Sequence, residues 1–280
     1  MVRLAILLPT YNSSLYLREL MDSVIRQSYD EWTLYIRDDK SSDNTLEIIQ
    51  EYMKSDPRIV LLNDDTKRGA MNGFFWLLEH VDADYYMFCD HDDVWCPDKV
   101  ALTLDRMQAV ANDNLPVVIH TDLKVVDSNL KVLSESYWRS CHFTDEQFND
   151  KYFHLVYNNV TGCTMMINQK AKQVAMPFPA EARMHDSWIA AAVLWHGGII
   201  EKVDSSTILY RQHCHNTIGA NEVPSIFRQI LSVRKLFRKT LVQHKVSRNL
   251  VKMNVLTFFL MKLYYMIKIH WASLSKFNNR

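Results

Sequence analysis

The sequence predicts an α/β fold built on a largely parallel sheet, and three observations carry that prediction. Short apolar runs alternate with segments of helical periodicity over residues 4–110, a pattern typical of strands joined by helical crossovers. Polar clusters follow several of the apolar runs. The chain has 280 residues, of which 48% are hydrophobic, enough for a sizeable core.

The first half contains four such strand and helix pairs. The run at 4–8 is ended by Pro9 and is typical of a buried parallel strand. We expect the strands at 4–8, 32–39, 58–64 and 85–90, and the helices at 12–29, 40–53, 68–81 and 97–110. Asn12, Ser13 or Ser14 can cap the first helix, Ser41 or Ser42 the second, and Pro97 suits the start of the fourth.

The second half is less regular. We expect a strand at 115–127, a turn at Gly162 leading into another strand, and a helix at 184–198 closed by Gly197 and Gly198. Residues 199–216 indicate a strand followed by a polar turn.

Charge divides the chain in two. Twelve Lys and Arg and no Asp or Glu lie between Ser225 and Arg280, which leaves twenty basic and thirty-two acidic residues before them. We therefore expect a main domain at 1–222 and a basic amphipathic helical tail at 223–280. Two interpretations of the tail stay open: interfacial helices on an anionic membrane, or helices packed on the acidic body. No run is long enough to span a membrane, and the odd count of five Cys suggests a reducing compartment.

The segment "YYMFCDHDDVWCPDKV" crowds Asp90, Asp92 and Asp93 behind an apolar run. Carboxylates at this spacing can share one hard cation, with a diphosphate supplying further oxygens. The alternative is an acidic turn before a helix.

Three other groups have two interpretations each. Asp38 and Asp39 follow a strand and can accept hydrogen bonds from a nucleobase or ribose, or form a solvated turn. Asp186, after His185, is a candidate general base or a helix-dipole residue. Arg211 and His213 can meet phosphate or metal. No dinucleotide, P-loop or hydrolase-elbow motif is present.

Six segments in order resemble family 2 glycosyltransferases, which have the GT-A fold, a Rossmann-like mixed sheet flanked by helices. They are "AILLPTYN", "YIRDDKSSDNT", "CDHDDVWCPDKV", "NNVTGCTMMINQKA", "HDSWIAAAVLWHGG" and "YRQHCHNTIGA", and together they reach from residue 3 to about 219. Their forms look most like the bacterial rhamnosyltransferase branch. Three residues depart from the family pattern: Lys40 and Cys214 stand where glycine is usual, and Ser187 stands where an aromatic residue is usual.

The resemblance implies a role for each matching residue. It assigns Asp39 to the pyrimidine, with Asp38, Pro9, Tyr11 and Asn12 beside the base and ribose, Asp90 to ribose or metal-bound water, and Arg211 to the nucleotide-sugar. Asp92 and His213 would bind Mn²⁺ or Mg²⁺, Asp186 would be the catalytic base, and Gly162, Cys163, His185 and Trp188 would lie on the acceptor side.

The implied reaction is inverting sugar transfer from dTDP-rhamnose or a UDP-hexose to a hydroxyl of a glycan or lipid-linked saccharide in surface polysaccharide synthesis. We expect the enzyme in the cytoplasm, peripheral on the membrane through 225–280, with no nucleic-acid partner. Two rivals are an inactive glycan-binding scaffold on the same fold and a phospho-acceptor receiver domain, which would need only half this length.

Overall fold

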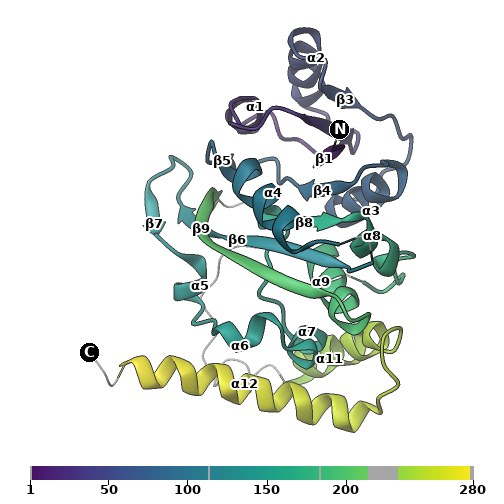
Figure 1. Ribbon diagram of the computed structural model, residues 1–280, viewed down its shortest axis with the longest axis vertical. Helices are drawn as coiled ribbons and strands as arrows, with labels where there is room; N and C mark the ends of the chain where they lie inside the picture. Colours follow the sequence, from purple (N-terminus) through teal and green to yellow (C-terminus); the bar gives the residue numbers. More distant parts are fainter. Residues whose placement is uncertain (1, 113, 183, 214–232, 278–280) are drawn as a thin grey trace.

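The computed structural model describes residues 2–112, 114–182, 184–213 and 233–277. Its centre is a nine-stranded mixed sheet, ordered β3-β2-β1-β4-β8-β6-β9-β5 with β7 beside β6 (Figure 1). The strands are β1 (Leu4–Thr10), β2 (Trp32–Asp38), β3 (Ile59–Leu61), β4 (Tyr85–Phe88), β5 (Val94–Trp95), β6 (Val117–Val126), β7 (Val132–Ser134), β8 (Met165–Asn168) and β9 (Ile199–Arg211).

Helices connect and cover the strands. They are α1 (Leu17–Ile25), α2 (Thr45–Ser55), α3 (Ala70–His80), α4 (Lys99–Val110), α5 (Tyr137–Ser140), α6 (Asp145–Phe148), α7 (Lys151–Val156), α8 (Gln169–Ala175), α9 (His185–Trp195), α11 (Val233–Ser247) and α12 (Val255–Phe277), with a 3₁₀ turn η1 at Gly162–Thr164. The four early strands and four early helices are confirmed, as are the later strands near 117 and 199 and the helix at 185.

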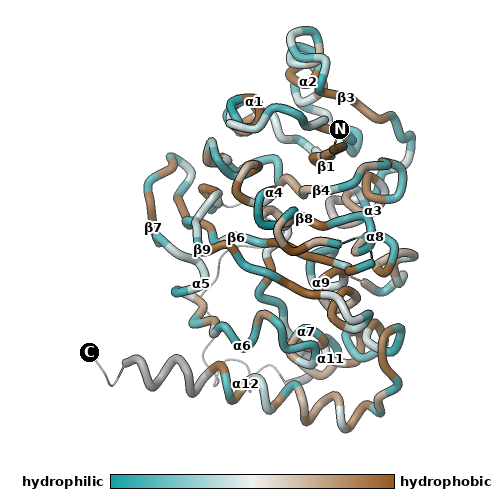
Figure 2. Tube along the Cα trace, in the orientation of Figure 1, coloured by the Kyte–Doolittle hydropathy of each residue, from teal (hydrophilic) through white to brown (hydrophobic). Residues whose placement is uncertain are grey.

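Strand β1 is buried along its whole length between β2 and β4, and both neighbours run parallel to it. Its side chains alternate between two layers. Leu4, Ile6 and Leu8 pack with α1, α2 and α4, whereas Ala5 and Leu7 pack with α3, α8 and α9. Figure 2 shows hydrophobic residues concentrated in these central strands.

The expectation of a largely parallel sheet is confirmed for β1 with β2 and β4, for β2 with β3, and for β6 with β9. Strand β8 runs antiparallel to both β4 and β6, and β5 runs antiparallel to β9. The sheet is therefore mixed, as the GT-A resemblance implies.

The expected helix caps are wrong. Helix α1 begins after Tyr16 and α2 after Asn44, in both cases without a side-chain cap, and α4 begins at Lys99, two residues after Pro97. Ser13 and Ser41 bind across neighbouring loops instead: the Ser13 amide donates to Thr45 Oγ1 at 2.7 Å and the Asn12 amide to Ser41 Oγ at 2.9 Å. At the end of α9, Gly197 has a φ of +75°, which confirms the expected glycine stop.

The tail packs on the body. Helix α12 lies along the bottom of the molecule in Figure 1, below α6 and α7. Its buried side chains Phe258, Tyr265 and Ile269 form a cluster with Phe153 and other residues of α7. No helix in the described ranges is long and apolar enough to cross a membrane. The expected domain boundary at 222/223 and Cys214 lie outside the described residues.

Candidate active site

The polar clusters predicted at strand ends do meet at one edge of the sheet. Thr10 pairs in register with Asp38, and the Asp39 amide donates to the Thr10 carbonyl at 2.8 Å. Strand β4 runs parallel on the other side of β1, and the Cys89 amide donates to the Leu7 carbonyl at 2.9 Å. Because parallel strands share their carboxyl edge, the three clusters become neighbours.

Asp38 and Asn12 shape the loops at this edge. The Asp38 carboxylate accepts hydrogen bonds from Thr10 Oγ1 at 2.9 Å and from the Ser41 amide at 2.8 Å. Asn12 has a φ of +47°, and its side-chain oxygen accepts from the Ser42 amide at 2.8 Å. Beside them the Tyr11 ring is 44% exposed, with Lys67 Nζ 4.0 Å from its centroid. Tyr11 is thus available for stacking on a base.

Pro9 lies under this loop and contacts α3. A Cβ at Gly73 would stand 2.8 Å from Pro9 Cβ, closer than side chains pack. Gly73 therefore permits α3 to approach β1 at the floor of the site.

Asp39 is buried and tightly held. Its carboxylate accepts from the Arg68 amide at 2.7 Å, the Gly69 amide at 2.8 Å and Arg37 Nη1 at 2.8 Å. Burial opposes ionisation of Asp39, but these hydrogen bonds outweigh it and lower its pKa. Arg37 also binds Asp64 at 3.0 Å. The loop that carries Asp64, Arg68 and Gly69 is thereby fixed over Asp39.

The acidic segment after β4 lies on the other side of β1. Asp92 is 8% exposed and Asp93 is fully buried, whereas Asp90 is half-buried. His213 Nε2 lies 2.9 Å from Asp92 Oδ2, and its ring stacks on Tyr16 at 4.9 Å between centroids. The structure therefore brings together the two side chains expected to bind metal.

Arg211 contacts the acidic segment directly and holds it in place. The side chain is 1% exposed; Nε donates to the Asp92 carbonyl at 2.8 Å, Nη1 to the Ser128 carbonyl at 2.7 Å, and Nη2 pairs with Glu19. Its backbone amide donates to Asp93 Oδ1 at 3.1 Å. These contacts position the Asp92–Asp93 turn, which differs from the direct phosphate contact expected of Arg211.

Crowding perturbs the carboxylates. Burial, followed by repulsion from Asp92 and Asp186, raises the pKa of Asp90; burial and repulsion from Asp92 and Asp90 raise the pKa of Asp93. Ligand atoms of Asp90, Asp93 and Cys163 lie within 4.8 Å of one another. A dication would relieve this repulsion, so the acidic segment fits one. Hard Mn²⁺ or Mg²⁺ prefers oxygen and imidazole, which favours the Asp92–His213 pair over the buried Cys163 thiol, whose pKa burial raises.

Asp186 comes from the distant helix α9 and reaches the same cluster. The Ser187 amide donates to its Oδ1 at 2.5 Å and the Gly162 amide to its Oδ2 at 3.2 Å. Burial raises the pKa of Asp186 to about 6, although the two amides oppose that rise. A Cβ at Gly162 would stand 2.5 Å from His185 Nε2. Only glycine can bring this amide to the carboxylate.

The remaining acceptor-side residues are mostly interior. His185 packs against Phe74 and Phe88, with ring centroids 4.2 Å and 4.8 Å away, and burial lowers its pKa to about 3. Cys163 is buried, and its Sγ lies near the carboxylates of Asp90 and Asp93. Trp188 is buried and donates from Nε1 to the Ala175 carbonyl at 2.8 Å.

The site also contains Tyr16, Lys99 and Arg37, which were not among the residues predicted. Tyr16 supports both His213 and Arg211, whose guanidinium carbon lies 4.3 Å from the ring centroid. Lys99 is fully buried near Asp93 and Cys163, and burial lowers its pKa to about 8. Lys99 follows Pro97 and Asp98 at the start of a helix, and nothing in this sequence indicates that its side chain is buried. Arg37, placed directly before the Asp38–Asp39 pair, was a detectable candidate for pairing with them.

The fold is of the α/β class, and the candidate site is a strand edge lined with carboxylates. The model of the family "Glycosyl transferase family 2" matches residues 5–174. The chain belongs to glycosyltransferase family 2 and is a glycosyltransferase.

Curated relatives have related names. The chain is 28% identical to the dTDP-rhamnosyl transferase RfbG of Shigella flexneri over 225 residues, which cover 76% of this chain and 73% of that protein. It is 33% identical over 103 residues to WfgD of Escherichia coli, named as a UDP-Glc:alpha-D-GlcNAc-diphosphoundecaprenol beta-1,3-glucosyltransferase. That alignment covers 37% of this chain and 40% of WfgD.

Solved structures share the GT-A fold. Staphylococcus aureus TarS 1–349 in complex with UDP superposes with a TM-score of 0.61 at 14% identity and covers 94% of this chain and 70% of that chain. The mannosyltransferase PcManGT of Pyrobaculum calidifontis, in complex with GDP-Man and Mn²⁺, has a TM-score of 0.62 at 16% identity, with 97% and 72% covered.

Proposed function

We propose that this glycosyltransferase transfers a sugar, with inversion, from a nucleoside-diphosphate donor to a hydroxyl of a lipid-linked saccharide in surface polysaccharide synthesis. One observation carries the proposal. Asp186 on α9 is held by the Gly162 and Ser187 amides close enough to the Asp90 segment for their charges to interact. A base and a diphosphate-binding edge therefore share one site.

Asp186 acts as the general base. A carboxylate with a pKa of about 6 is ionised at neutral pH yet basic enough to accept the proton of an acceptor hydroxyl during attack. The two amide hydrogen bonds fix the direction of the carboxylate. The acceptor oxygen bonds to the anomeric carbon as the nucleoside diphosphate leaves from the opposite face, which inverts the configuration.

The donor lies along the carboxyl edge of β1, β2 and β4. Tyr11 offers an exposed ring to the base, Asp39 and the Arg68–Gly69 turn form the end of the base pocket, and Asp38 and Asn12 support its wall. Asp90 lies nearer the ribose and diphosphate. Arg211 is a positioning residue for the acidic turn.

Asp92 and His213 would hold Mn²⁺ or Mg²⁺, which supplies positive charge to the leaving diphosphate when bound. PcManGT, whose structure contains Mn²⁺, supports this proposal. RfbG supports dTDP-rhamnose as the donor, with a UDP-hexose as the alternative that WfgD suggests. WfgD also supports a diphospholipid-linked acceptor.

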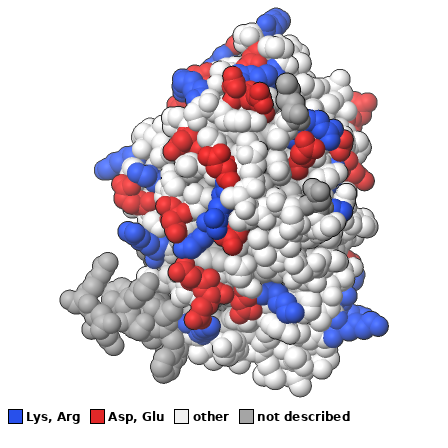
Figure 3. Space-filling model, in the orientation of Figure 1, with Lys and Arg blue, Asp and Glu red and all other residues white. Residues whose placement is uncertain are grey.

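We also propose that the domain boundary falls at 222/223 and that the tail attaches the enzyme to the cytoplasmic leaflet of a membrane. Helix α12 exposes Leu256, Leu260, Leu263, Tyr264 and Ile267. These five residues recur at helical spacing on the side opposite Phe258, Tyr265 and Ile269. Figure 3 shows mostly uncharged atoms along the lower edge of the face drawn, where α12 runs. Lysines and arginines around such a stripe suit an anionic leaflet.

Nucleotide binding tests the donor site. We would measure the thermal midpoint of the native protein and of Asp92→Asn with dTDP, UDP or GDP, each with and without Mn²⁺. At a hundredfold excess over Kd, binding stabilises by about 2.7 kcal/mol, which raises the midpoint by on the order of 5 °C. We expect a metal-dependent shift with dTDP or UDP that Asp92→Asn loses. No shift with any nucleotide would favour the scaffold alternative.

A further inference from the structure

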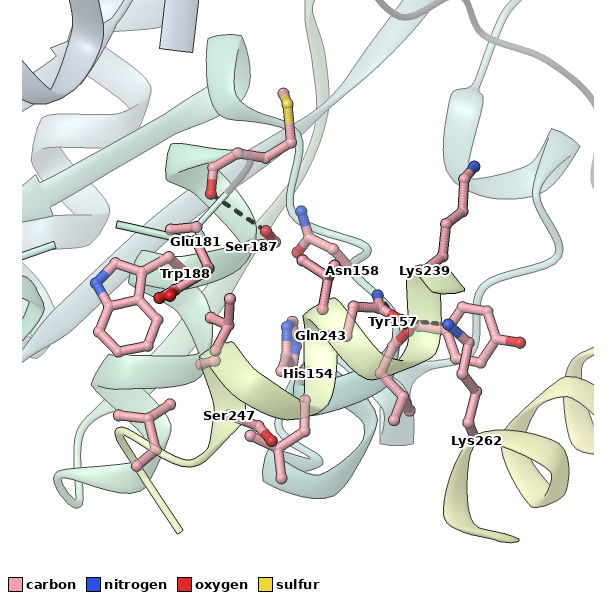
Figure 4. Close-up of a pocket in the computed structure, with 18 residues that line it drawn as sticks. His154, Tyr157, Asn158, Glu181, Ser187, Trp188, Lys239, Gln243, Ser247 and Lys262 are labelled. Carbon is pink, nitrogen blue, oxygen red and sulfur yellow. Dashed lines mark hydrogen bonds between the residues drawn. The ribbon is translucent and has the colours of Figure 1, made fainter. Parts of the chain in front are cut away.

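A cavity of about 610 Å³ lies between the catalytic body and the tail (Figure 4). Its walls come from α7, the segment before α9, α9 itself and α11, and Lys262 of α12 closes one side. The volume is within the range of sites that bind small organic ligands. The cavity is separate from the carboxylate cluster that binds the donor.

The walls are mainly apolar. Leu155 and Val156 of α7, Trp188 and Ala191 of α9, and Val246 of α11 contribute hydrophobic surface. Glu181 also lines the cavity, but its charge is matched by an ion pair with Lys245. His154 is 3% exposed and its Nδ1 has no hydrogen-bond partner among the described residues. An apolar ligand with a few polar groups matches this wall.

Positive charge gathers at one end. Figure 4 shows Lys239 and Lys262 on the same side of the cavity, away from Trp188 and Glu181. Lys262 donates to Gln243 Oε1, a neutral partner. Burial, and then the nearby charge of Lys239, lower the pKa of Lys262 to about 8. Neither lysine forms an ion pair with a carboxylate in the part of the chain described, so this end of the cavity carries positive charge complementary to a phosphate.

The cavity adjoins the proposed base. Ser187 follows Asp186 directly, donates its amide to that carboxylate and lines the cavity wall. Its small side chain forms the part of the cavity wall that is adjacent to Asp186 in the sequence. A ligand in the cavity is thus held beside the N-terminus of α9, where the acceptor hydroxyl must lie.

We infer that this cavity binds the lipid end of the acceptor. The aliphatic chain lies against α7, α9 and α11, and the phosphate or diphosphate that joins it to the saccharide is bound by Lys239 and Lys262. The inference rests on the proposed function, because it names the part of the acceptor that the body and the tail hold together. It also gives the basic tail a role in catalysis besides membrane attachment.

Isothermal titration with farnesyl diphosphate, farnesol and inorganic diphosphate separates the two halves of the ligand. We expect farnesyl diphosphate to bind at least about tenfold more tightly than either fragment, because chain and phosphate both contribute. Equal binding of farnesyl diphosphate and inorganic diphosphate would show a surface anion site and overturn the inference.

Substitutions in the cavity test where farnesyl diphosphate binds. Lys239→Met with Lys262→Met should weaken farnesyl diphosphate at least about tenfold, whereas Lys252→Met, which removes an exposed tail lysine, should not. Ala191→Phe fills the cavity and should abolish binding of the chain. Unchanged affinity in both the double lysine variant and Ala191→Phe would contradict the proposal.

Donor hydrolysis distinguishes the two proposals. The cavity variants should bind dTDP or UDP and release nucleoside diphosphate to water at the native rate, which also shows that they fold. Native protein that turns over donor but does not bind farnesyl diphosphate would overturn this inference alone. Native protein without donor binding or turnover would overturn the proposed function.

Discussion

At the residue scale, Lys40 shows how a departure from the family pattern is accommodated. It stands where the family resemblance leads us to expect glycine, and it adopts a φ of +62°. Left-handed backbone costs an L-residue about 1 kcal/mol or more. The loop retains this geometry because Asp38 and Asn12 bind the amides of Ser41 and Ser42 on the same turn. Lys40 is therefore a strained residue in a loop that its neighbours hold in place.

Replacing Lys40 should reveal that strain. Lys40→Gly relieves the left-handed conformation and should raise the free energy of unfolding by up to about 1 kcal/mol, reduced by the greater chain entropy of glycine. Lys40→Val, which is β-branched, should lower it by about 1 kcal/mol or more. Urea denaturation measures both. A glycine variant less stable than the valine variant would show that this turn is not strained.

At the element scale, α12 has two apolar sides with different partners. Phe258, Tyr265 and Ile269 are buried against α7, and the Tyr265 hydroxyl donates to Asp150. Leu256 and Leu260 point away from the body and are 66% and 56% exposed. A helix that served only to cover the body would need a single apolar stripe. The second stripe is the structural basis for the proposed membrane contact.

Substitutions on the two sides should separate folding from membrane binding. Phe258→Ala removes a fully buried ring and should cost about 3 to 5 kcal/mol of stability. Leu256→Ser with Leu260→Ser should change stability by less than about 1 kcal/mol yet weaken cosedimentation with anionic vesicles. Native vesicle binding by the double serine variant would contradict a membrane role for this stripe.

Elements with continuous or periodic apolar residues could be predicted from the sequence. Leu4–Leu8 and Tyr85–Phe88 are strands that could be predicted from their uninterrupted apolar residues. Because the ends of these strands lie next to each other, the polar clusters that follow them were correctly predicted to be neighbours. Strand β5, two residues long, depends on pairing with the distant Leu209 and Ile208, so no local pattern could indicate it. The role of Arg211 could not be predicted either, because its hydrogen bonds to the Asp92 and Ser128 carbonyls join residues that are far apart in the sequence.

At the scale of the whole molecule, three buried histidines link stability to pH. His120 and His154 both contact Phe148, whereas His185 packs against Phe74. Burial lowers the pKa values of His120, His154 and His185 to about 3, 4 and 3. The unfolded chain takes up a proton on each near pH 6.5, whereas the folded protein does not until far lower pH. Their contribution to stability is therefore complete above about pH 6.5 and is lost progressively as the pH falls.

We expect unfolding to become easier by about 2 kcal/mol per buried histidine between about pH 7.5 and 5. His120→Phe should reduce this pH-dependent loss of stability by the contribution of one histidine. The variant should fold, because a phenyl ring fits between Trp138 and Phe148, whose centroids lie 5.1 Å and 5.0 Å from the imidazole. Urea denaturation at the two pH values measures the difference. An identical pH dependence in native protein and variant would show that His120 is not the neutral group inferred here.

The central claim is that Asp186 is the base of sugar transfer at the edge formed by β1, β2 and β4. Its most direct test is the rate of nucleoside-diphosphate release with acceptor present, from dTDP-rhamnose or UDP-glucose, by native protein and by Asp186→Asn. The amide conserves shape and leaves the donor pocket intact, so nucleotide affinity should stay the same while turnover falls by about 10² to 10⁴-fold. Native-like turnover by Asp186→Asn would contradict the account.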